Sequence, residues 1–90
     1  MDNLANTLCA LALEHSGKSL EVRIAAGLSQ DIGIFRDEDG VSYVYHLTWI
    51  RQGKEIDFLL EVMSVIPNKR KDRKPKVEMM ATRQFTQKGY

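Results

Sequence analysis

The spacing of hydrophobic residues divides the chain into a helical beginning and a longer β-rich part. Leu4, Leu8 and Leu11 recur at helical spacing, and the apolar residues between them widen one face. Gly17 follows this stretch and supplies the left-handed residue that commonly ends a helix. We therefore predict one helix over about 3–16.

After Gly17 the apolar period falls from 3.6 residues to two, the period of a strand with one buried face. Leu20, Val22 and Ile24 alternate with Glu21 and Arg23, and this alternation predicts a first strand. Later apolar segments predict further strands. The complete set is 19–26, 31–36, 41–51, 55–66 and 76–85.

Two short segments predict tight turns between these strands. Asp37-Glu38-Asp39-Gly40 predicts a hairpin, because Asp-Gly readily adopts the positive φ angles that such a turn needs. Gln52-Gly53-Lys54 predicts another turn. The segment 77–85 is open to two interpretations, strand or helix, because its Met and Ala residues also suit a helix. As a strand it would place four apolar residues on one face: Val77, Met79, Ala81 and Phe85.

The element order predicts an α+β fold in which one N-terminal helix packs on a four- or five-stranded antiparallel β-meander. We expect 1–90 to be a single domain, because its 90 residues match the size of one domain. The expected core contains Leu4, Leu8, Leu11, Val22, Ile24, Leu47, Trp49, Leu60 and Val62.

The predicted strand 55–66 has more apolar residues than one helix can cover. It is apolar at nearly every position from Phe58 onward, which is typical of a strand buried on both faces. We therefore expect a second covering surface, supplied by a homodimer or higher oligomer or by another protein.

Composition agrees with a folded domain in the cytoplasm. The chain is 43% hydrophobic and 28% charged, as globular proteins are. The only cysteine, Cys9, excludes an intramolecular disulfide. No apolar run approaches the ~18 residues of a membrane span, and no basic region precedes the first apolar stretch. We expect a reducing, cytoplasmic location and no membrane contact.

Charge is distributed unevenly along the chain. Residues 1–67 contain ten acidic and five basic residues, whereas 68–90 contain eight basic and two acidic ones, so the overall net charge of +1 hides both parts. Like charges close together repel and stay solvated, so 68–76 is predicted to be an exposed basic segment. Its basic residues are Lys69, Arg70, Lys71, Arg73, Lys74 and Lys76.

The sequence contains no pattern that identifies catalytic, metal or cofactor chemistry. Cys9, His15 and His46 follow no metal-ligand spacing, and the scattered glycines form no phosphate-binding loop. Asp37-Glu38-Asp39 lacks the alternating acids and distant glutamate of a calcium loop. We expect neither an enzyme nor a bound metal or cofactor.

Two functions fit these observations. The leading hypothesis is a small non-enzymatic regulatory or inhibitory protein, of the kind common in phages and mobile elements, that binds another protein. Its expected interface is Tyr43, Tyr45 and Trp49, with the basic segment supplying steering and rim contacts. The alternative is a nucleic-acid-binding protein that holds the phosphate backbone through 69–76. The absence of aromatic residues from that segment counts against base stacking.

Overall fold

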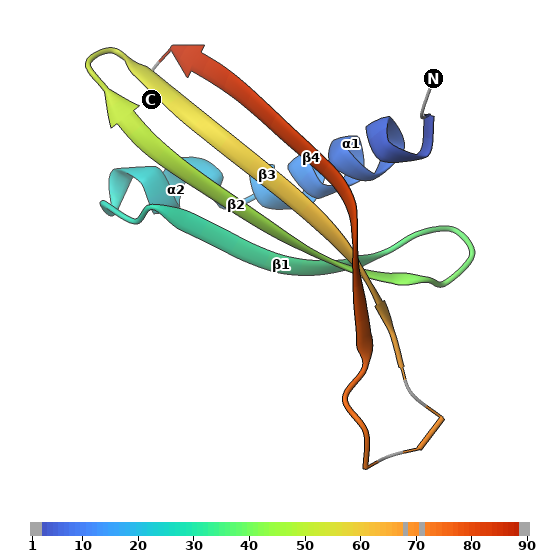
Figure 1. Cartoon of the computed structure of the whole chain (residues 1–90). Coiled ribbons are helices and arrows are strands. Elements are labelled where there is room, and N and C mark those ends of the chain that lie inside the picture. The colour runs from blue at the N-terminus through green and yellow to red at the C-terminus, as the bar shows by residue number, and fades with distance from the viewer. Residues whose placement is uncertain (1–2, 68, 71, 89–90) are drawn as a thin grey trace.

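The computed structural model describes residues 3–67, 69–70 and 72–88 of the chain. Two helices come first, and four strands follow, so the fold is α+β (Figure 1). The elements are α1 (Asn3–Gly17), α2 (Leu20–Ala25), β1 (Gln30–Arg36), β2 (Ser42–Gln52), β3 (Glu55–Ile66) and β4 (Lys76–Lys88).

The strands form one antiparallel sheet in the order β1-β2-β3-β4, a meander in which each strand pairs with its neighbour in the chain. α1 crosses one face of this sheet (Figure 1). We call that side the helix face and the opposite side the open face. The predicted architecture of an N-terminal helix on an antiparallel sheet is confirmed, with four strands.

The predicted first helix is confirmed as α1, which buries Leu8, Cys9, Ala12 and Ser16 against the sheet. Leu11 is only partly buried, and the prediction that Leu4 belongs to the core is wrong. Leu4 is 51% exposed because it lies in the first turn of α1, before the part of the helix that crosses the sheet.

The predicted strand over 19–26 is wrong, because Leu20–Ala25 forms the short helix α2. Its alternating residues also have a helical spacing, since Leu20 and Ile24 are four residues apart and share one helix face. Leu20 is buried and Ile24 is partly buried, whereas Val22 points away and is 72% exposed. Val22 is therefore not a core residue. Because 20–25 is helical, β1 is the edge strand at that side of the sheet.

Both predicted hairpin turns are present. Between β1 and β2, the Asp37 carboxylate accepts hydrogen bonds from the backbone N–H groups of Asp39 and Val41, both at 2.9 Å, and Gly40 has a φ of 82°. The bond from Val41 and the others from this turn lower the pKa of Asp37. Gly53 takes a positive φ of 63° between β2 and β3.

The segment 77–85 is a strand within β4, which removes the helical alternative. β4 contains a bulge: Val62 lies opposite Ala81 and Met63 opposite Met79, so Met80 is the extra residue. Because one added residue reverses the alternation, Ala81 and Phe85 face α1 while Val77 and Met79 face the open side. The expectation that these four residues share one face is therefore wrong.

The core lies between α1 and the helix face. Leu47, Trp49, Leu60 and Val62 are buried there as predicted. Tyr43, Tyr45, Phe58 and Ile56 are also buried, and Phe58 stacks on Phe85 with ring centroids 4.9 Å apart. The alternate residues of β3 from Asp57 to Val65, which point to the open face, are only partly buried, because no described element covers that face.

Candidate functional site

The basic segment forms the tip of a projecting hairpin. β3 and β4 extend past the main body of the sheet and are joined by the segment 67–75 (Figure 1). We call residues 66–76 the basic arm. Lys69, Arg70, Arg73, Lys74 and Lys76 are all exposed there, as predicted. Asn68 and Lys71 lie outside the described residues.

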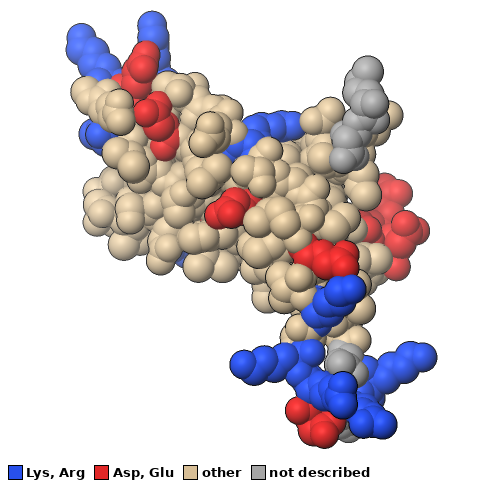
Figure 2. All heavy atoms as spheres, viewed as in Figure 1, with Lys and Arg blue, Asp and Glu red and all other residues tan. Residues whose placement is uncertain are grey.

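The arm separates positive charge from the rest of the molecule. Lysine and arginine side chains gather at the tip of the hairpin, while acidic side chains are spread over the body (Figure 2). The segment 69–76 has six basic residues and one acid, a net charge of +5. At the base of the arm, Lys76 pairs with Glu78 at 2.9 Å. Such a tip attracts an anionic surface and is weakened by salt.

The open face carries an apolar row that crosses all four strands. The strand register aligns Ile34 with Val44, Val44 with Met63, and Met63 with Met79. We call these four residues the apolar row. Ile34 is 67% exposed and Met79 is 53% exposed, so the two ends of the row are open to solvent.

The row continues toward the basic arm. Val65 pairs with Val77 on the same face, and the next pair along the hairpin, Ile66 and Lys76, is the base of the arm. Val77 is exposed and Val65 is partly buried. Exposed apolar surface that is continuous with a cluster of one charge is typical of a protein-binding site.

Farther from the arm the open face becomes polar. The imidazole of His46 lies 3.0 Å from the amide oxygen of Gln30 and 4.0 Å from the carboxylate of Glu61. Beyond it is a shallow groove of about 520 Å³, between two rows of side chains of β2, β3 and β4. These side chains are Thr48, Ile50, Asp57, Leu59, Gln84 and Thr86.

The aromatic residues that were expected to form the interface are buried instead. Tyr43, Tyr45 and Trp49 lie on the helix face, within the core that α1 and α2 cover. Tyr43 stacks on Phe35 with a centroid distance of 5.4 Å, and Tyr45 meets His15 of α1 edge-on at 5.8 Å. Their burial leaves almost no surface for a partner, because α1 occupies the side to which they point.

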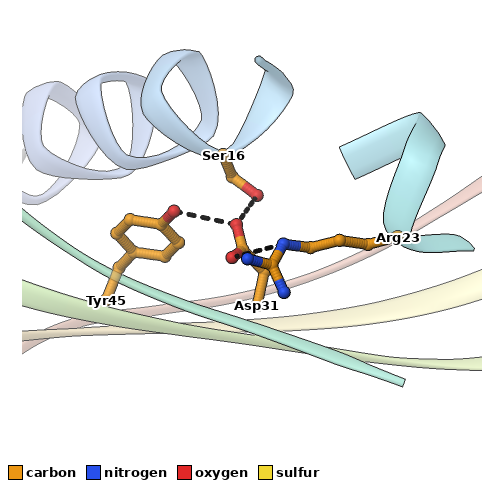
Figure 3. Close-up of polar contacts among 4 residues, drawn as sticks. All are labelled: Ser16, Arg23, Asp31 and Tyr45. Carbon is orange, nitrogen blue, oxygen red and sulfur yellow. Dashed lines mark hydrogen bonds and ion pairs between the residues drawn. The ribbon is translucent and has the colours of Figure 1, made fainter. Parts of the chain in front are cut away.

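A buried polar cluster, not anticipated from the sequence, joins the helices to the sheet (Figure 3). Its centre is Asp31 of β1, which is 3% exposed. One carboxylate oxygen accepts hydrogen bonds from the Ser16 hydroxyl at 2.6 Å and the Tyr45 hydroxyl at 2.8 Å. The other oxygen lies 3.2 Å from Nε of Arg23. The only sequence signal for this cluster was an acidic residue, Asp31, directly before the apolar residues of β1.

The cluster is arranged to hold its elements together. Burial, followed by the hydrogen bond to Asp31, raises the pKa of Tyr45 to about 12, so its hydroxyl stays protonated and donates. Ser16, Arg23, Asp31 and Tyr45 come from α1, α2, β1 and β2. Asp31 receives three partners and is closed to solvent, so no position is left beside it for a substrate.

No group of three or more His, Cys, Asp or Glu residues within the described parts of the chain is placed to hold a metal ion. Cys9 is buried as a free thiol in α1. Across residues 3–67, 69–70 and 72–88, neither helix combines the length and the apolar character needed to cross a membrane.

Comparisons with protein families, with curated proteins and with solved structures found no match to this chain.

Proposed function

We propose that this chain is a small non-enzymatic regulatory protein that acts by binding another protein through its open face. The observation that carries the proposal is the apolar row of Ile34, Val44, Met63 and Met79, which crosses the sheet and continues toward the basic arm. α1 covers only the helix face. The interface expected on Tyr43, Tyr45 and Trp49 is replaced by this surface.

The partner should have an apolar centre and an acidic rim. Interfaces usually combine a core depleted in charge with a polar periphery, and the row and the arm have this arrangement. The arm has a net charge of +5 in 69–76 and would speed the encounter with an acidic surface. Burial of the row would then slow dissociation. As part of this proposal, the protein acts in the cytoplasm.

The test uses two pairs of variants with matched chemistry. The row variant carries Ile34→Ser and Met79→Ser, and its control carries Val22→Ser and Leu28→Ser, which are also exposed apolar residues but lie on and after α2. The arm variant carries Lys69→Ala, Arg73→Ala and Lys74→Ala. Its control carries Lys18→Ala, Arg36→Ala and Lys54→Ala, which remove the same residue types from the body.

Each protein is used to capture partners from nuclease-treated extract of the source cells, and the captured protein is then purified for binding kinetics. We expect one stoichiometric partner with an acidic surface. The partner should dissociate from the row variant about tenfold faster, or more, than from the wild type. It should associate with the arm variant several-fold more slowly, with little change in the dissociation rate. Both controls should bind like the wild type. A partner that binds the row variant and wild type equally would contradict the proposal.

A second function is favoured by the shape of the arm. A two-stranded ribbon fits the major groove of DNA, and here its basic tip projects away from the acidic body, which reduces the repulsion that the body would exert (Figure 2). Lys69, Arg70, Arg73 and Lys74 would contact phosphates, without base stacking.

This function is tested with a fluorescent duplex of about 20 base pairs and a single strand of the same length. Phosphate binding through Lys69, Arg70, Arg73 and Lys74 predicts an affinity loss of about 10²-fold between about 50 and 200 mM salt. The arm variant should then lose binding while the body control and the row variant retain it. Retention by the arm variant would exclude this function, and tight wild-type binding at physiological salt would favour it over protein binding.

A further inference from the structure

β4 is a long edge strand with an open side. It has 13 residues and pairs along one side with β3, and no described residue pairs with its other side. Edge strands with unpaired backbone groups are templates for another strand. The part from Ala81 to Lys88, after the bulge, is the uninterrupted part of this edge.

The direction of the free backbone groups follows from the hydrogen bonds of β2. The Trp49 N–H donates to the Ser29 carbonyl at 3.0 Å, and the Asp37 N–H donates to Val41 at 3.1 Å. The odd-numbered residues of β2 therefore bond toward β1, and the even-numbered ones toward β3. When this alternation is continued through the strand register, the backbone N–H and C=O groups of Ala81, Arg83 and Phe85 point toward β3. The outward backbone groups belong to Thr82, Gln84, Thr86 and Lys88.

This edge has little protection against pairing. From Ala81 to Gln87 the only charged residue is Arg83, and the segment contains neither proline nor glycine. Thr82, Gln84 and Thr86 present uncharged side chains on the open face. The bulge at Met80 disrupts pairing only at one end.

α1 overhangs the same edge. Nη2 of Arg83 in β4 donates to the Asn6 side-chain oxygen at 3.0 Å, so this part of α1 lies over β4. The preceding turn extends beyond the strand in Figure 1, and it contains the exposed Leu4. A strand added to β4 would lie below this turn and cover Leu4. The exposure of Leu4 is thus a second observation, independent of the free backbone groups, that points to the same edge.

We propose that a second copy of this chain pairs with β4 through its own β4, antiparallel, to form an eight-stranded sheet. A two-fold axis at Gln84 places Thr82 opposite Thr86 of the second copy and Arg83 opposite Phe85 of the second copy. Hydroxyl pairs and a cation beside an aromatic ring both favour this register. An axis at Thr82 would instead bring the bulge at Met80 into the paired segment, where it would disrupt the ladder.

The two copies are related by a closed two-fold symmetry, because each contributes the same surface. The pairing leaves the apolar row and the basic arm outside the contact, since both lie on the other side of the bulge from Ala81. Dimer formation through β4 is therefore independent of the proposed protein-binding function. It can be measured as the mass of the purified protein.

The experiment measures mass by light scattering at about 50 µM, because association depends on concentration. We expect twice the mass of the single chain for wild type. Gln84→Pro removes an outward N–H without removing a bond to β3, so it should give a folded monomer. Gln84→Val keeps the N–H and should remain a dimer. A monomeric wild type, or a dimer that withstands Gln84→Pro, would overturn the proposal.

Disulfide formation tests the register without relying on the proline variant. In Gln84→Cys the two introduced thiols would face each other near the two-fold axis, at a Cα separation of about 5.5 Å, which permits a disulfide. In Thr82→Cys they would lie about 13 Å apart along the strands and should not link. Oxidation should therefore link the first variant and not the second. Equal linking of both, or linking of Thr82→Cys alone, would contradict the proposed register.

Discussion

Asp31 is the residue on which the junction of helices and sheet depends most directly. It accepts hydrogen bonds from Ser16 and Tyr45 and pairs with Arg23, in a position that is almost closed to solvent. Gly33 belongs to the same arrangement, because a Cβ at that position would meet the ring of Tyr45. The Asp31 carboxylate thus links β1 to one side chain from each of α1, α2 and β2.

Asp31→Asn should lower the free energy of unfolding by about 1–3 kcal/mol, because it keeps the shape but removes the charge and one of the two acceptor oxygens. Chemical denaturation measures this loss. Glu38→Gln is the control, since Glu38 is exposed in the turn after β1, and it should change stability by no more than about 0.5 kcal/mol. Equal stability of the two variants would show that the cluster contributes nothing.

Tyr45 should make the stability of the protein fall at high pH. Its pKa is raised from 10.0 to about 12 in the folded protein, so the resulting stabilisation is complete below pH 10 and is lost as the pH rises to about 12. The absorbance of phenolate should show a late ionisation step that Tyr45→Phe removes and Tyr43→Phe retains. A wild-type titration completed near pH 10 would contradict this assignment.

At the scale of the elements, β3 contributes side chains to both faces of the sheet. Its buried residues pack under α1 while the residues between them reach the open face. Leu60 is fully buried and Leu59, its neighbour, is only partly buried. One strand therefore supplies both the core and the surface proposed for binding.

Leu60→Ala should destabilise the protein by about 2–5 kcal/mol, because it leaves a cavity between α1 and the sheet. Leu59→Ala removes the same atoms from the open face and should cost roughly 1 kcal/mol or less. Denaturation midpoints of the two variants provide the comparison. If Leu59→Ala cost as much as Leu60→Ala in the monomer, the open face would have to be covered within the chain.

At the scale of the whole molecule, charge is separated in space as well as in sequence. The basic residues of 69–76 lie on the arm, while most acidic residues belong to the body (Figure 2). This separation favours directed encounter with an anionic surface, and the described basic side chains of the arm are exposed.

The arm variant Lys69→Ala, Arg73→Ala and Lys74→Ala should therefore fold normally, although its net charge changes from +1 to −2. These side chains are exposed, so the free energy of unfolding should stay within about 0.5 kcal/mol of the wild-type value. Circular dichroism and thermal melting measure this. A large loss of stability would mean that the arm packs on the body.

The sequence by itself determined α1, three of the strand positions in the final sheet with their turns, and the exposed basic segment. These features depend on local periodicity, on glycine in turns and on repulsion between like charges. The strand nature of 76–85 was also predicted, but as one of two interpretations. The apolar excess of 55–66 predicted burial on both faces, but within the described chain only the helix face of β3 is fully covered, and the second covering surface stays a prediction.

Only the tertiary structure decided which residues face the core. Leu20, Val22 and Ile24 fit a strand or one helical turn equally well, and packing of Leu20 beside α1 selected the helix. The bulge at Met80 moved Met79 to the open face, a shift that alternation alone does not reveal. The sequence places Tyr43, Tyr45 and Trp49 on one strand face and predicted an exposed interface there, yet α1 covers that face. Which face a helix covers is set by contacts between distant segments, so it cannot be read from local pattern.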